Sequence, residues 1–89
     1  MTNEQLRAQL EHLHGELQQA NALDSRQRER LETLANEIQE LLDRNESRPD
    51  HYRSLRERLS DEVAQLEASH PQITLLMRGA IDSLAYLGI

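Results

Sequence analysis

The sequence predicts an all-α protein, because its composition suits helices and its apolar residues recur at helical spacing. Of the 89 residues, 29% are charged and 2% are aromatic, with only three Gly and two Pro. Few of these residues favour strands. Apolar side chains recur three and four positions apart in four successive stretches. We therefore expect one domain over residues 1–89, with four helices packed as two antiparallel hairpins in a bundle.

The first helix is expected over residues 3–21. It carries a narrow seam of leucines at intervals of four, three and four: Leu6, Leu10, Leu13 and Leu17. A seam of this kind, as in coiled coils, buries one stripe against neighbouring helices. Gly15 lies within the helix and costs about 1 kcal/mol relative to Ala, so we expect the helix to depend on packing.

The second helix is expected over residues 25–44. Asp24 is placed to cap it, and Gln27, three positions later, completes a variant of the capping box. Its apolar stripe consists of Leu31, Leu34, Ala35, Ile38, Leu41 and Leu42. Only residues 21–23 connect it to the first helix, and so short a connection predicts an antiparallel hairpin.

The polar, Pro-containing stretch 45–50 is expected to be a loop and the best candidate for a flexible hinge. A third helix is expected over residues 51–69, with a stripe formed by Tyr52, Leu55, Leu59, Val63 and Leu66. His70 precedes Pro71, and a residue before proline avoids the α region, so the helix should break there. Whether the third and fourth helices then fold back on each other or continue as one kinked rod stays open.

The fourth helix, expected over residues 71–87, is far more apolar than the others. Arg78 and Asp82 are its only charged residues, and Leu75, Ala85 and Tyr86 widen its apolar surface past an ordinary stripe. We expect this helix to be largely buried or to lie at an oligomer interface. The residues expected to form that interface are Ile73, Leu76, Met77, Ala80, Ile81, Leu84 and Leu87.

Both ends of the fourth helix carry capping signals. Ser69 or His70 can cap its N-terminus, and Pro71 suits the first helical turn. At the other end, Gly88 supplies a left-handed position, after which Ile89 can fold back as in a Schellman motif. A structural capping role is therefore the favoured interpretation of His70.

Composition excludes several classes of protein. The chain has no Cys, which excludes disulfides, thiolate metal sites and cysteine nucleophiles. Its net charge of −6 and the lack of a basic face argue against nucleic-acid binding. The N-terminus does not resemble a secretory signal, and the charges in the fourth helix argue against a transmembrane span. We expect a cytoplasmic protein that does not bind membranes.

Two Glu-x-x-His pairs, Glu11 with His14 and Glu67 with His70, are the sharpest candidates for a metal site, because di-iron bundles use this spacing. Chance alone gives roughly half a pair of this spacing in a chain with eleven Glu and four His, so two pairs are not a rare excess. His70 also stands at a helix break, and no further Glu lies at a clear core position. Solvated surface residues are therefore the favoured interpretation, and we expect no metal and no cofactor.

Other polar residues give no stronger signal. Arg26, Arg28 and Arg30, together with Arg53, Arg56 and Arg58, could contact phosphate, but interleaved acidic residues favour ion pairing along the helix surfaces. The serines have no adjacent base or strained glycine turn that would activate them. We therefore predict no catalytic residue and a protein that is not an enzyme.

The C-terminal third carries a family resemblance. His70-Pro71, the apolar helix containing Arg78 and Asp82, and the ending Leu87-Gly88-Ile89 resemble a family of short bacterial proteins known as domain of unknown function 4404. The similarity extends along the whole chain, including Leu23-Asp24 and Glu37-Ile38-Gln39. The resemblance implies a small bacterial helical protein, and it implies no activity.

The function expected from these observations is a helical interaction module that assembles with itself, with a dimer favoured, or binds a protein partner through its C-terminal helix. Covering apolar side chains left exposed on that helix would supply the driving force. Three alternatives stay open: an acidic adaptor or inhibitor of a basic protein, a metal-binding helical bundle, and attachment to a membrane surface through the same helix.

Overall fold

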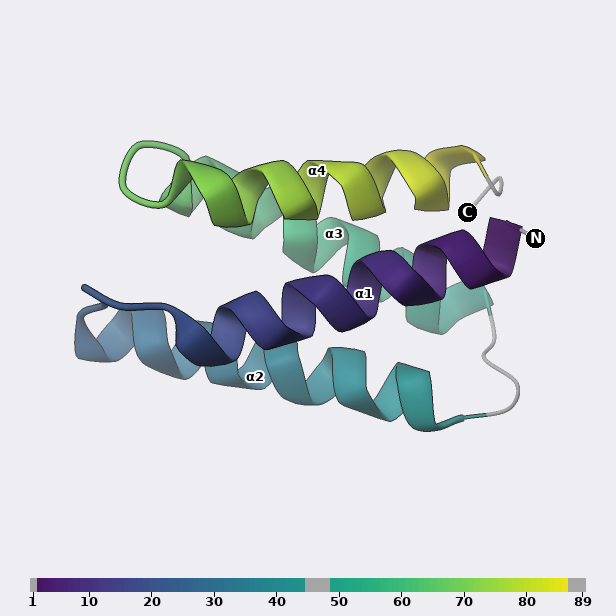
Figure 1. Ribbon diagram of the computed structural model, residues 1–89, viewed down its shortest axis with the longest axis horizontal. Coiled ribbons are helices and arrows are strands. Elements are labelled where there is room, and N and C mark those ends of the chain that lie inside the picture. The colour runs from purple at the N-terminus through teal and green to yellow at the C-terminus, as the bar shows by residue number, and fades with distance from the viewer. Residues whose placement is uncertain (1, 45–48, 87–89) are drawn as a thin grey trace.

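Four helices make up the fold in a computed structural model that describes residues 2–44 and 49–86 (Figure 1). They are α1, Thr2–Gln19; α2, Ser25–Asp43; α3, Pro49–Leu66; and α4, Pro71–Tyr86. No strand occurs in these two described ranges. The all-α prediction is confirmed, and each helix begins and ends within a few residues of its expected bounds.

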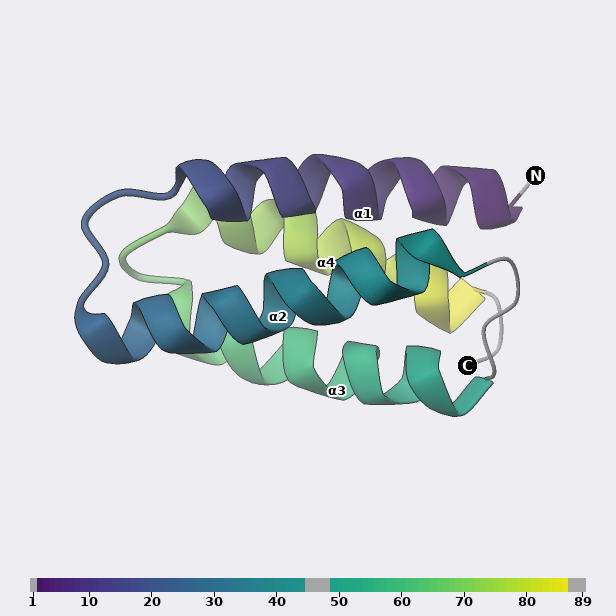
Figure 2. The same ribbon diagram turned by 90° about the horizontal axis from the view of Figure 1, so that it is seen from below.

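The helices pack in a ring that follows the chain order. α1 packs against α2, α2 against α3, α3 against α4, and α4 against α1, while the diagonal pairs α1–α3 and α2–α4 do not pack against each other. Figures 1 and 2 show successive helices running in opposite directions, with the α1–α2 and α3–α4 connections at the same end. The two predicted hairpins are therefore present, and α4 folds back along α3 instead of extending it as a rod.

The core is built from the predicted leucine seams. Buried on α1–α3 are Leu6, Leu10, Leu13, Leu17, Leu31, Leu34, Ala35, Ile38, Leu41, Leu42, Leu55, Leu59 and Leu66. Tyr52 and Val63 of the α3 stripe are only partly buried against this core. Removing these apolar side chains from water is the main favourable contribution to folding.

The start of α2 follows the sequence prediction in atomic detail. The backbone nitrogen of Gln27 donates to the Asp24 carboxylate at 2.7 Å, and the backbone nitrogen of Asp24 donates to the Gln27 side-chain oxygen at 3.1 Å. This reciprocal pair is a capping box, and it satisfies amide groups that have no partner within the helix. Asp24 therefore fixes where the second helix begins.

The expected loop at 45–50 is too long, because α3 already begins at Pro49. Proline suits the first helical position, since its fixed φ is helical and the amide hydrogen it lacks would have no partner there. The expected hinge at 45–48 lies outside the described residues. Pro49 therefore starts a helix here, where the sequence analysis had counted it as part of a loop.

The third helix ends earlier than expected, at Leu66 instead of Ser69. The backbone nitrogens of Ser69 and His70 both donate to the carbonyl of Leu66, at 3.1 and 2.8 Å. These bonds wind the chain into a tight turn and satisfy the carbonyl of Leu66, the last residue of α3. The turn allows α4 to reverse direction within a few residues.

Replacing Gly15 by Ala is expected to stabilise the protein. A Cβ atom at Gly15 would meet nothing within 4 Å, so the methyl group fits without strain. Ala lowers the entropy of the unfolded chain and suits the helix better, which should raise the free energy of unfolding by about 0.5–1 kcal/mol. Urea unfolding followed by circular dichroism measures this change. Ala8→Gly, at an exposed position of the same helix, should lower stability by a similar amount; an unstabilised G15A protein would contradict the prediction.

Candidate interaction surface on helix α4

The inner side of α4 is buried within the chain itself. Ile73, Met77, Ala80 and Leu84, four of the residues expected at an interface, lie in the core that the four helices share. Leu76 and Ile81 are partly buried against the same core. The remaining candidate, Leu87, lies outside the described residues. Most of the expected interface is therefore occupied by intramolecular packing.

This burial follows from the position of α4 between two neighbours. Because α4 packs against both α1 and α3, a broad stripe of its surface is covered within one chain. A second chain can reach Leu76 and Ile81 only at their exposed edges. The prediction that α4 contacts a partner stays a prediction, and a folded bundle offers its outer face for such contact.

The outer face of α4 carries two large exposed hydrophobic residues. Leu75 is 64% exposed and Tyr86 is 76% exposed, and they are the exposed large hydrophobics of the described residues. Eleven positions separate them, which is close to three helical turns, so they lie on the same side of the helix about 16 Å apart along its axis. Arg78 and Asp82 are exposed between them.

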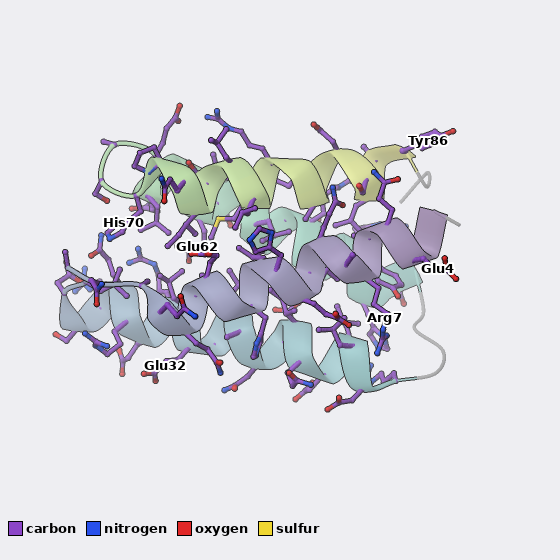
Figure 3. The ribbon with its side chains drawn as sticks, in the orientation of Figure 1. Glu4, Arg7, Glu32, Glu62, His70 and Tyr86 are labelled. Carbon is purple, nitrogen blue, oxygen red and sulfur yellow. The ribbon has the colours of Figure 1, made fainter. Side chains whose placement is uncertain are left out.

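A shallow groove runs beside this face, between α4 and α1. It is lined by Gln5, Gln9, Gly79, Asp82, Ser83 and Tyr86. Within it, the Ser83 hydroxyl donates to the Gln9 side-chain oxygen at 2.5 Å. Tyr86 lines the groove, and Figure 3 shows it at the end of α4, on the side of the bundle where Glu4 lies in the first turn of α1. We call the outer face of α4, with Leu75, Arg78, Gly79, Asp82 and Tyr86, the α4 surface.

Arg78 on the α4 surface already has one partner. Its Nη2 atom lies 2.7 Å from the Glu67 carboxylate, and both side chains are about half exposed to solvent. Exposed ion pairs of this kind contribute little to stability, because water and salt screen them. A second chain could therefore recruit Arg78 at small cost to the fold.

The structure does not bring the two Glu-x-x-His pairs together. Glu11 lies 3.6 Å from Arg7 of its own helix, and Glu67 pairs with Arg78. The two pairs stand on α1 and at the end of α3, and these helices do not pack against each other. Within residues 2–44 and 49–86, no group of three or more His, Cys, Asp or Glu could hold a metal ion. The geometry therefore gives no support to a di-metal site.

His70 connects the two loops at one end of the bundle. Its Nε2 atom lies 2.9 Å from the carbonyl oxygen of Asn21, in the α1–α2 connection, and its Nδ1 atom lies 2.9 Å from the Ser69 hydroxyl. A bond to the carbonyl requires that Nε2 carry the proton. Because both ring nitrogens are engaged this way, the His70 ring does not cap α4; the role is structural, but it differs from the expected one.

Three arginines of the cluster pair with acidic residues, two of them between helices. The guanidinium of Arg30 on α2 lies 3.2 Å from the carboxylate of Glu62 on α3, and Arg58 on α3 lies 2.7 Å from Glu37 on α2. Arg53 pairs along its own helix with Asp50, at 3.9 Å. Arg30 and Arg58 therefore join α2 to α3, which differs from the expected pairing along each helix surface, whereas the Arg53 pair agrees with it.

Glu62 is a buried charge, which corrects the expectation that no further Glu lies at a core position. It is only 5% exposed (Figure 3). The signal was present in the spacing: Leu55, Leu59, Glu62 and Leu66 step by four, three and four, as the α1 seam does. Val63, which is expected in the stripe because it is apolar, is only partly buried.

These features define a small antiparallel four-helix bundle whose outer α4 surface is the best candidate for contact with another molecule. The chain belongs to the family described as Domain of unknown function (DUF4404), whose model matches residues 6–89. The searches of curated proteins and of solved structures returned no match. Across the described helices, none is long and apolar enough to cross a membrane.

Proposed function

We propose that this protein is a non-enzymatic interaction module that associates with another protein chain through its α4 surface. The observation that supports this proposal is the position of Leu75 and Tyr86, which are both exposed and both on the outer side of one helix. The proposal includes the expectations of a bacterial origin and a cytoplasmic location. Self-association as a dimer is the favoured form.

The physical argument concerns where apolar surface remains after folding. Single exposed hydrophobic residues are ordinary on protein surfaces, but clustering on one face is typical of interaction sites. Here the residues on α1–α3 that form the apolar stripes are buried or partly buried. The large exposed hydrophobic side chains of the described residues, Leu75 and Tyr86, both lie on α4. Tyr is also enriched at interfaces, because its ring is apolar and its hydroxyl can still meet water.

The double variant Leu75→Glu with Tyr86→Ser is expected to abolish association without unfolding the chain. Both side chains are largely exposed, so the core is unchanged. Native mass spectrometry of the wild-type protein should show a multiple of the 10.3 kDa chain, and the variant should appear as a monomer with an unchanged melting temperature. Asn36→Glu, an exposed position on the diagonal helix α2, is the matched control and should keep the wild-type mass.

Other outcomes of the same spectrum redirect the proposal. A retained basic protein whose binding weakens with salt would support the acidic adaptor or inhibitor, since the chain carries a net charge of −6. An added mass of tens of daltons per chain would support the metal-binding bundle. A wild-type monomer without a retained partner, or an assembly that survives in the double variant, would contradict an interface on the α4 surface.

A further inference from the structure

We propose that the partner on the α4 surface is a second copy of this chain, with its α4 antiparallel to the first. The twofold axis lies between the two helices, at the level along α4 midway between Ala80 and Ile81. This inference rests on the proposed function and adds the identity and orientation of the partner. Twofold symmetry pairs each residue on one helix with a residue equally distant from the axis on the other. Leu75 and Tyr86 on α4 match that requirement, and Arg78 and Asp82 match it to within one residue.

The first match is apolar. Leu75 and Tyr86 lie at equal distances on either side of the midpoint between Ala80 and Ile81. In an antiparallel pair, Leu75 of each chain therefore faces Tyr86 of the other. The two equivalent contacts cover both exposed hydrophobic residues of each chain. In a parallel pair, Leu75 would face its own copy, and the two Tyr86 rings would meet at the far end.

The second match is electrostatic. Arg78 and Asp82 are the charged residues of α4, and they lie on either side of the same midpoint. Antiparallel packing brings each Arg78 within one residue of Asp82 in the other chain. Parallel packing would set Arg78 against Arg78 and Asp82 against Asp82, which is unfavourable. The charge pattern is therefore self-complementary only in the antiparallel orientation.

The third observation is the glycine beside the axis. Gly79 lies opposite Asp82 of the second copy, and a glycine lets two helix backbones approach closely. The fold of the single chain does not require a glycine at position 79. A Cβ atom added to Gly79 would meet only the end of the Gln9 side chain, at an ordinary contact distance of 3.4 Å. A glycine weakens the interior of a helix. Close approach by a second α4 helix would explain why Gly79 occurs within α4.

The area available indicates a weak dimer. The chain exposes 5806 Å² in total, and a standard interface covers about 800 Å² per partner. The proposed contact is limited to one face of α4, a helix of 16 residues that is about 24 Å long. We therefore expect dissociation constants in the micromolar range, so that the dimer forms at the concentrations used for cross-linking and separates on dilution.

Cross-linking through introduced cysteines tests the orientation directly. The chain has no cysteine, so each variant carries a single reactive thiol. We would mix Leu75→Cys chains with Tyr86→Cys chains, one of them isotopically labelled, and treat the mixture with a short bis-maleimide. The expected product joins position 75 of one chain to position 86 of the other, in excess over both like-to-like products. Asn36→Cys, on the diagonal helix, is the control and should give no cross-linked dimer.

The outcomes separate this inference from the proposed function. Like-to-like cross-links in excess would overturn the antiparallel orientation and keep self-association through α4. A dimer in which neither cysteine cross-links above the control would overturn both the antiparallel orientation and association through the α4 surface. A chain that stays monomeric at high concentration but retains a different protein would overturn the second copy as partner and keep the interaction module.

Charge reversal gives an independent test. Arg78→Asp and Asp82→Arg should each weaken the dimer by at least about tenfold, because each places like charges together across the axis. The double variant, which exchanges the two charges, should restore the dissociation constant to near the wild-type value. Both residues are exposed, so the melting temperature of the diluted monomer should stay constant. A double variant as weak as the single variants would contradict the antiparallel pairing.

Discussion

Replacing Leu84 by Asp is expected to unfold the chain. Leu84 is completely buried in the core near the end of α4. The substitution removes a large apolar side chain, which by itself costs about 2–5 kcal/mol when Leu becomes Ala. It also places a carboxylate in the apolar core, and an unpaired buried charge adds several kcal/mol. Small domains have only about 5–10 kcal/mol of stability in total.

Circular dichroism at 222 nm and native mass spectrometry would test this prediction together. The L84D protein should show the spectrum of a largely unfolded chain at 25 °C, and Leu84→Met, which keeps the volume, should melt close to the wild-type temperature. Leu75→Asp is the matched control, because it makes the same chemical change on the exposed side of the same helix. An L84D protein with unchanged mass and melting temperature would contradict the position of Leu84 in the core.

The contrast between Leu84 and Leu75 shows what the sequence could not decide. Both residues belong to an apolar helix, and periodicity alone assigns neither to an intramolecular core nor to an interface. The assignment depends on how many neighbours cover the helix. Because α4 lies between α1 and α3, its stripe from Ile73 to Leu84 is covered within one chain. That arrangement is a property of the tertiary fold.

The elements themselves followed from local chemistry. The capping box at Asp24 and the proline at position 71 depend on interactions within a few residues, and the leucine seam of α1 is a periodicity visible in the sequence itself, so the sequence predicts all three. The bond from His70 to the carbonyl of Asn21 joins residues 49 positions apart, and spacing along the chain gives no signal for it. The same limit hid the pairing of Arg30 with Glu62.

The burial of Glu62 has a different lesson. On α3, spacing predicts Glu62 as the buried residue between Leu59 and Leu66, whereas apolarity favours Val63, and spacing is the better guide here. A carboxylate at a seam position is expensive unless a cation reaches it. Arg30, on the neighbouring helix α2, provides that cation for Glu62 on α3, and the Arg30 side chain stays 31% exposed. The long apolar stem of arginine can cover the core while its guanidinium group meets both the carboxylate and water. The pair is therefore asymmetric in burial.

This asymmetry predicts unequal effects when either partner is removed. Arg30→Met is expected to lower the free energy of unfolding by about 2–3 kcal/mol, below the value for fully buried pairs because Arg30 is partly solvated. It leaves the Glu62 carboxylate, whose side chain is 7% exposed, without its cation. Glu62→Leu should cost less, because the arginine left behind can turn to water. Urea unfolding of both variants, with the m-value checked for two-state behaviour, measures the difference.

The double variant Arg30→Met with Glu62→Leu decides whether the pair stabilises the fold or only satisfies a buried charge. Replacing a buried ion pair by apolar residues of similar volume is often neutral or stabilising, so we expect the double variant to be at least as stable as the wild-type protein. Arg58→Met is the control, since Arg58 also pairs across α2 and α3 but with the more exposed Glu37; it should cost less than about 1 kcal/mol. Equal losses for R30M and E62L would contradict the asymmetry. A double variant as unstable as R30M would show that the ion pair, beyond compensating its own burial, holds the α1–α2 hairpin against the α3–α4 hairpin.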